Sequence, residues 1–123
     1  MAVWLFWAAG ALAGVWFLVH LFMGGREIAQ PLLEVTAIEP TVRHTQYLCW
    51  HFTSVSIASM AGFYAAAAVS GNAAFAIAGT VLALGFLVIG VMLVVRLGES
   101  HARLPQGWLF LPVAALGIAG LVM

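Results

Sequence analysis

Apolar residues fill four long stretches of this chain: Ala2–Met23, Tyr47–Val69, Ala73–Val95 and Leu104–Met123. None of the four contains Asp, Glu, Lys or Arg. Each has close to the roughly 20 residues that a helix needs to cross a hydrocarbon core about 30 Å thick. A helix on the surface of a soluble domain keeps a polar face, whereas these stretches are apolar around most of their circumference. The pattern therefore predicts an all-α membrane protein.

We expect residues 1–123 to form a single polytopic membrane domain, a four-transmembrane-helix up-and-down bundle. The spans are expected at about 2–23, 44–70, 73–95 and 105–123. Gly24-Gly25 is expected to end the first span, because glycine weakens a helix. Glu39-Pro40 resembles a helix start, with Pro tolerated in the first turn. A helix from there to Ser70 would exceed the bilayer core, so its first turns should project from it. Ser70–Asn72 is typical of a tight hairpin turn.

The charged residues lie in two of the connections between these spans. Four Arg residues flank or occupy those connections, at Arg26, Arg43, Arg96 and Arg103, and the chain has no Lys. Basic connections stay on the cytoplasmic side of a membrane. We therefore expect linkers at about 24–43 and 96–104 to be cytoplasmic and both termini to lie on the non-cytoplasmic side.

Composition narrows the classes of function. Hydrophobic residues make up 65% of the chain and charged residues 7%. No cluster of Lys and Arg exists that would bind nucleic acid. Without Asp, a Ser-His-Asp triad is excluded, and the single Cys49 allows no intramolecular disulfide. The use of Arg without Lys, with much Ala and Gly, suggests a GC-rich bacterial genome, so we expect the bacterial inner membrane as the location.

The four histidines, His20, His44, His51 and His101, all fall toward the predicted cytoplasmic side. On a helix His44 and His51 share a face with Tyr47. His20 and His51 are expected at similar depth, just inside the membrane boundary, with Arg96 at about the same level. An ionisable residue within a span is a hypothesis of function.

Three interpretations of these histidines remain open. His20 and His51 would ligate a transition metal or a b-type haem, because imidazole suits such metals. Alternatively, His20, His51, His44, Tyr47 and Arg96 line a pocket for a quinone or an anionic lipid headgroup. In the third interpretation the histidines hydrogen-bond across helices and only fix the packing.

Small residues suggest close helix packing. Gly10 and Gly14 form a G-x-x-x-G pattern, which serves either dimerisation or packing within the chain. The lack of large loops and catalytic sets leads to the main hypothesis: an accessory, scaffold or assembly component that packs with itself as a homo-oligomer or with a larger membrane complex. The alternative is a redox or binding protein that holds haem, metal, quinone or a lipid headgroup in a His-lined pocket.

Overall fold

The computed structural model describes all residues from Met1 to Met123, and they form helices and connecting loops with no strand. The all-helical prediction is thus confirmed. The elements are α1 (Val3–Leu18), the π-helix η1 (Val19–Ala29), α2 (Gln30–Glu34), α3 (Pro40–Ser70), α4 (Ala73–Leu97), the short 3₁₀ helix η2 (Trp108–Phe110) and α5 (Leu111–Val122).

Three helices are long and apolar enough to cross a membrane: the continuous helix Val3–Glu34, then Pro40–Ser70 and Ala73–Leu97. The fourth apolar helix, Trp108–Val122, is shorter. Its three residues of η2 and twelve of α5 give a length of about 22 Å, less than a hydrocarbon core of about 30 Å. The structure therefore has three helices that could span a membrane, and a fourth complete span stays a prediction.

The prediction that Gly24-Gly25 ends the first helix is wrong. The helix continues through both glycines as η1 and ends only at Glu34, so the connection to α3 is Val35–Glu39 instead of 24–43. The physical reason is packing. A Cβ at Gly24 would lie 2.9 Å from the Trp50 ring, so the missing side chain makes room for this indole. Neither glycine has a positive φ.

The remaining helix ends follow the sequence signals. Glu39 caps α3, and its carboxylate accepts a hydrogen bond from the Val42 N–H at 3.2 Å. Hydrogen bonds from the Thr41 and Val42 backbone hold the pKa of Glu39 below its ordinary value. Gly71 ends α3 with a φ of 69°, a left-handed conformation that suits glycine. The expected start at Glu39-Pro40 is confirmed, and so is the tight turn after Ser70.

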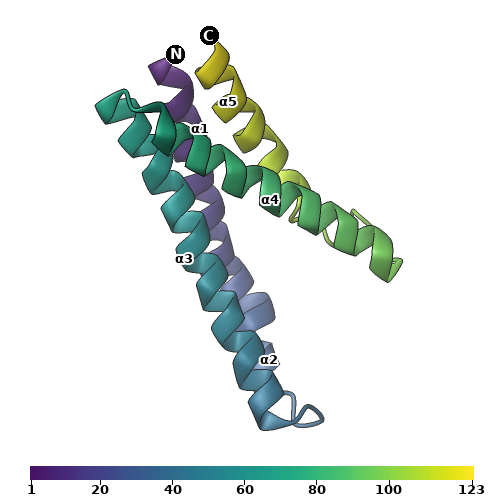
Figure 1. Ribbon diagram of the computed structural model, residues 1–123. Helices are drawn as coiled ribbons and strands as arrows, with labels where there is room; N and C mark the ends of the chain where they lie inside the picture. Colours follow the sequence, from purple (N-terminus) through teal and green to yellow (C-terminus); the bar gives the residue numbers. More distant parts are fainter.

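The helices form two arms that diverge from a shared end (Figure 1). One arm is the antiparallel pair of α3 with the continuous helix α1–η1–α2, and the other is α4 with the returning loop and α5. At the shared end α1 packs on α3 and α5, and α4 packs on the same two helices. Both termini and the α3–α4 turn lie there, and the Ala2 N–H donates to the Gly120 carbonyl at 2.9 Å.

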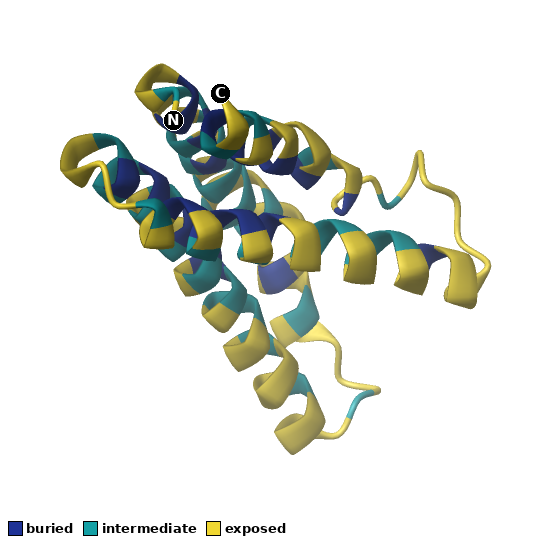
Figure 2. Ribbon diagram, turned by 45° about the horizontal axis from the view of Figure 1, so that its top comes forward, coloured by how far each residue is buried: buried dark blue, intermediate teal, exposed yellow.

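The core fills this shared end, as the buried positions in Figure 2 show. Its centre is Tyr64 of α3, which is fully buried and whose Oη lies 3.0 Å from Thr80 Oγ1 on α4. Thr80 donates to the Ala76 carbonyl at 2.8 Å. The Tyr64 hydroxyl therefore donates to Thr80 and, over a longer 3.5 Å, to the Val113 carbonyl of α5. Gly79 of α4 and Gly117 of α5 lie against the Tyr64 side chain. Small residues therefore join the two arms around one aromatic side chain.

Gly10 is used within the chain. A Cβ there would lie 3.3 Å from the Ala61 carbonyl oxygen and 3.3 Å from the Tyr64 Cβ, both on α3. Gly14 has nothing within 4 Å of such a Cβ. The structure thus favours packing between α1 and α3 over dimerisation for the first glycine of the pair.

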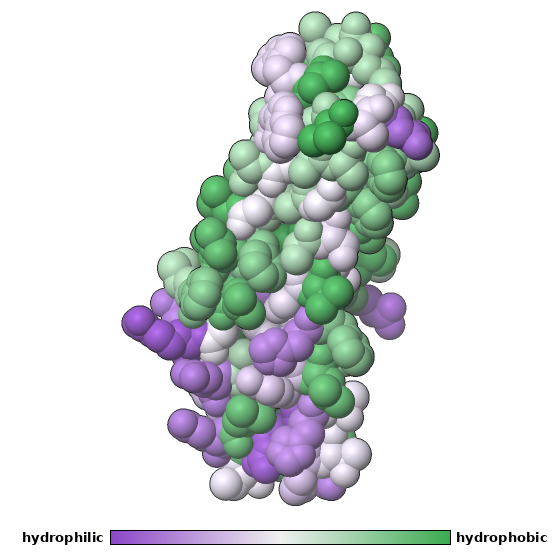
Figure 3. Space-filling model, turned by 90° about the vertical axis from the view of Figure 1, so that its left-hand side faces the viewer, coloured by the Kyte–Doolittle hydropathy of each residue, from purple (hydrophilic) through white to green (hydrophobic).

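Polar side chains gather at the end of the first arm, around the α2–α3 connection, whereas the shared end is mostly apolar (Figure 3). With 31 residues, α3 is about 46 Å long, which exceeds the bilayer core of about 30 Å. The part of α3 that exceeds the bilayer core is its polar end, so we expect this end to project from the membrane.

Candidate functional site

His20 packs against Trp50 across the first arm. Their ring centroids are 4.1 Å apart with an interplanar angle of 14°, so the imidazole of η1 lies flat on the indole of α3. His20 Nε2 lies 3.2 Å from the Trp50 carbonyl oxygen. A carbonyl only accepts hydrogen bonds, so Nε2 carries the proton and donates. His20 therefore fixes both the backbone and the ring of Trp50.

His51, the next residue of α3, lies beside Tyr47. The two rings meet edge to face, with centroids 4.7 Å apart. Both side chains line a depression of about 270 Å³ between the two helices of the first arm. We call it the polar depression. It is lined by Leu21, Phe22, Gly25, Arg26, Ala29, Gln30, Tyr47, Trp50 and His51.

A second depression, of about 530 Å³, adjoins the first and shares Leu21 and His51 with it. Its further lining residues are Phe17, Ser54, Val55, Ala58 and Ser59. We call it the apolar depression. Along α3 it extends from His51 to Ser59, about 12 Å at 1.5 Å per residue. His51 thus lies at the junction of a polar and a mostly apolar hollow.

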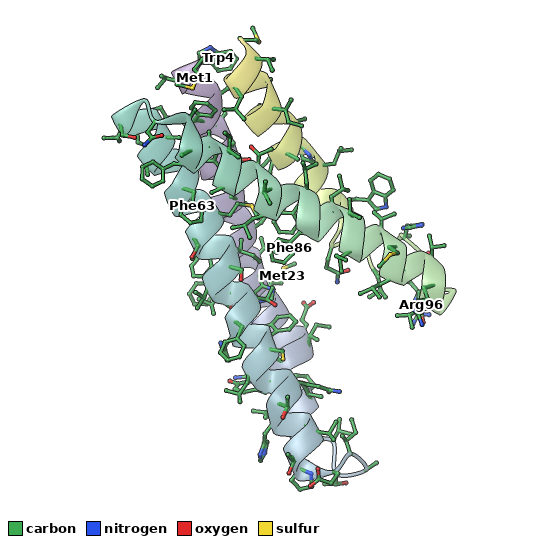
Figure 4. The ribbon with its side chains drawn as sticks, viewed as in Figure 1. Met1, Trp4, Met23, Phe63, Phe86 and Arg96 are labelled. Carbon is green, nitrogen blue, oxygen red and sulfur yellow. The ribbon has the colours of Figure 1, made fainter.

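Two of the predicted site residues lie away from this pair of depressions. Arg96 lies near the far end of α4, in the other arm (Figure 4), and so is not brought to His20 and His51. His44 is exposed on the polar end of α3 and lines neither depression. Of the predicted set, Tyr47 and His51 line the polar depression, whereas His20 lines neither depression and packs on Trp50.

The sequence analysis missed Arg26, Gln30 and Trp50 as parts of this site. Arg26 and Gln30 were assigned to a linker, because the first helix was expected to end at Gly24-Gly25. The continuing helix carries them to the polar depression instead. The sequence offered no signal for this, because the i→i+5 bonding that widens the turn and places His20, Gly24 and Ala29 on one face is seen only in the structure. Ala29 is indeed buried.

Trp50 contributes an unused hydrogen-bond donor. Its Nε1 atom is buried and has no partner, although Trp50 also lines the polar depression. A buried N–H without an acceptor is costly. Trp16 Nε1 and Arg43 Nε are buried without a partner as well, so this feature is not confined to the depression. By contrast, Thr53, Ser54 and Ser56 each bond the carbonyl four residues back, as expected for such residues in an apolar helix.

The geometry bears on metal and haem binding. No group of three or more His, Cys, Asp or Glu side chains lies close enough together to hold a metal ion. Nε2 of His20 is already bonded to the Trp50 carbonyl, so its ligation of a metal would require this bond to break. His101, the remaining histidine, accepts from Trp108 Nε1 at 3.1 Å in the other arm.

Comparisons with models of known protein families, with curated proteins and with solved structures gave no match. The fold alone defines the class: an all-helical protein with three helices long enough to cross a membrane.

Replacement of Gly24 by Ala tests the contact that builds the site. The new Cβ would lie 2.9 Å from Cζ2 and 3.0 Å from Cη2 of Trp50, so the indole that stacks on His20 must shift. Overpacking of this kind costs about 1–3 kcal/mol. We expect a lower thermal unfolding midpoint in detergent. Gly25→Ala is the matched control, because nothing lies within 4 Å of a Cβ there. Equal unfolding midpoints of the Gly24→Ala and Gly25→Ala variants would show that Trp50 does not pack on Gly24.

Proposed function

We propose that the protein is a small accessory or scaffold protein of the bacterial inner membrane. It works through helix packing with a second copy of itself or with a larger membrane complex. The observation that carries this proposal is the second arm. Beyond the core, α4 has a loop and no helix beside it, since α5 is too short to follow it. Large apolar side chains are exposed around this part of α4: Val88, Ile89, Met92, Leu93, Val95 and Leu97.

The divergence of the arms supports the same proposal. In a closed four-helix bundle each helix covers its neighbours along its length, whereas here the arms separate near Met23 of the first and Phe86 of the second (Figure 4). Met23 is 56% exposed. Another transmembrane helix, from a second copy or from a larger complex, would cover these side chains. The Arg residues, all distant from the shared end, favour cytoplasmic tips for both arms.

Photo-crosslinking in cells tests this proposal. A photoreactive residue at Met92 should give a protein adduct of defined mass, twice that of the chain for a homo-oligomer and larger or different for another complex. The control position is Val69, which is 77% exposed but lies next to the α3–α4 turn. Mild detergent extraction should recover the same assembly. A lone monomer after extraction, with no adduct at Met92, would remove the proposal.

A second candidate function is a binding protein whose ligand occupies the depressions at His51. The observation that favours it is the lining of the polar depression, to which Arg26, Gln30, Tyr47 and His51 contribute and no carboxylate does. An absorption spectrum and elemental analysis of the purified protein test the haem and metal versions: a Soret band or stoichiometric metal would support them. Lipid extraction with mass spectrometry tests the versions with quinone or a lipid headgroup.

A further inference from the structure

We infer that the two adjoining depressions bind one anionic phospholipid, with its phosphate in the polar depression and an acyl chain in the apolar one. This inference deepens the second candidate function, since it names the ligand class of that same site. It is independent of whether the protein assembles with a partner.

The polar depression offers hydrogen-bond donors and a cation. Arg26, Gln30, Tyr47 and His51 line it, and no carboxylate does. The structure contains one ion pair, between Arg103 and Glu99 in the other arm, so Arg26 has no ion-pair partner. These groups can donate several hydrogen bonds to an acceptor-rich anion, and the guanidinium of Arg26 adds a charge-assisted one. A phosphodiester has the required negative charge and several acceptor oxygens.

Glu27 and Glu34 are the acidic residues on the same continuous helix. Both are exposed and neither lines the depression, whereas Arg26 does. From the facing helix α3 come His51 and Tyr47 in the depression, with Arg43 and His44 further toward the polar end. The charge directed at the site is therefore positive, although the net formal charge of the chain is zero.

The position of the site also fits a lipid. Leu21 and Phe22 precede Arg26 and Gln30 on the continuous helix. This helix runs from the mostly apolar shared end to the polar end of the first arm (Figure 3). Phosphates of a bilayer lie between its apolar interior and the water, and basic pockets between helices there suit anionic headgroups. A volume of about 270 Å³ is at the low end for ligand pockets, so it suits a headgroup better than a macrocycle.

The apolar depression explains why the ligand would have a chain. It adjoins the polar one through Leu21 and His51 and continues toward the membrane interior. Ala58 keeps it open, since the residue is exposed and small, and Phe17 and Val55 supply apolar walls. A free phosphate would use only the polar depression. The pair of hollows matches an amphiphile whose phosphate and chain are adjacent.

Native mass spectrometry of the full chain in mild detergent tests this inference. We expect one phosphatidylglycerol to bind per chain and to bind more tightly than phosphatidylcholine. Arg26→Gln should weaken phosphatidylglycerol binding about fivefold, the factor that corresponds to about 1 kcal/mol. Arg103→Gln is the matched control, because Arg103 lies in the loop of the other arm and is 79% exposed. It should leave the affinity unchanged.

A second pair of variants separates a lipid from a free phosphate. Ala58→Leu fills the apolar depression and should weaken phosphatidylglycerol binding, while Ala115→Leu, at an exposed position on α5, should not. Inorganic phosphate should compete poorly. Equal losses in the two Arg variants, or equal binding of the two lipids, would overturn the inference. So would efficient competition by phosphate without an effect of Ala58→Leu. All readings count the lipid bound per chain, whatever the number of chains in the complex, so such results would leave the crosslinking test of assembly untouched.

Discussion

Replacement of Gly117 by Ala should separate the two arms at their shared end. An added methyl group at this position of α5 would overlap both the Tyr64 Oη and the Thr80 Oγ1 atoms. The hydrogen bond between those oxygens joins α3 to α4, so the overlap breaks it while both groups stay buried. We expect a loss of about 3 kcal/mol or more, from overpacking together with an unsatisfied buried hydroxyl. Thermal unfolding in detergent measures this loss.

Gly85→Ala is the control for this variant, since it adds the same methyl group to α4 where nothing lies within 4 Å. It should leave the midpoint unchanged or raise it, because Ala favours helix. A double variant gives a sharper test: Tyr64→Phe removes one of the overlapping oxygens and should recover part of the loss caused by Gly117→Ala. A loss that is the same with Tyr or Phe at position 64 would contradict the proposed contact.

The sequence predicts the helical elements well, because each depends on local signals. Apolar length identifies the long helices, and Glu39-Pro40 and the Ser70–Asn72 turn mark ends that the structure confirms. The arrangement of the helices depends on contacts between distant residues. Gly117, Gly79 and Tyr64 make the shared end, and nothing in a hydropathy pattern indicates which glycines face which aromatic ring. The divergence of the arms was therefore not predictable.

The candidate site likewise divides into features that local sequence signals predict and features that depend on contacts between distant residues. The depth argument placed His20 and His51 at similar depth, from the apolar spans and the aromatic residues Tyr47 and Trp50 at the boundary. In the structure His20 packs on Trp50, and His51 is the next residue of α3. The prediction at Gly24 was wrong because a glycine in an apolar stretch is typical both of a helix end and of a position where another side chain packs closely on the helix. Only the position of Trp50 decides between the two. Arg26 was excluded from the site by that one misinterpretation.

Replacement of Gly90 by Ala should detach the loop that joins α4 to α5. The new Cβ would lie 2.6 Å from the Gly107 Cα and 3.0 Å from the Gly107 N. These are backbone atoms, which cannot rotate away as a side chain does, so the loop itself must move. Gly107 is buried just before η2, and Phe110 of η2 stacks on Phe86 of α4 with centroids 4.8 Å apart. The movement should therefore also disturb the start of α5.

We expect Gly90→Ala to lower the unfolding midpoint by an amount equivalent to about 2–3 kcal/mol and to expose the loop 98–107 to protease. Gly107→Ala should act in the same way, since its Cβ would lie 2.9 Å from the Val91 N on α4. Because both changes break one contact, their effects should not add in the double variant. If the losses of stability in the double variant were fully additive, the backbones at Gly90 and Gly107 would not be in contact. The same would follow if the loop resisted protease as well in Gly90→Ala as in Gly85→Ala. The second arm would then need another explanation for how a short α5 is held against a longer α4.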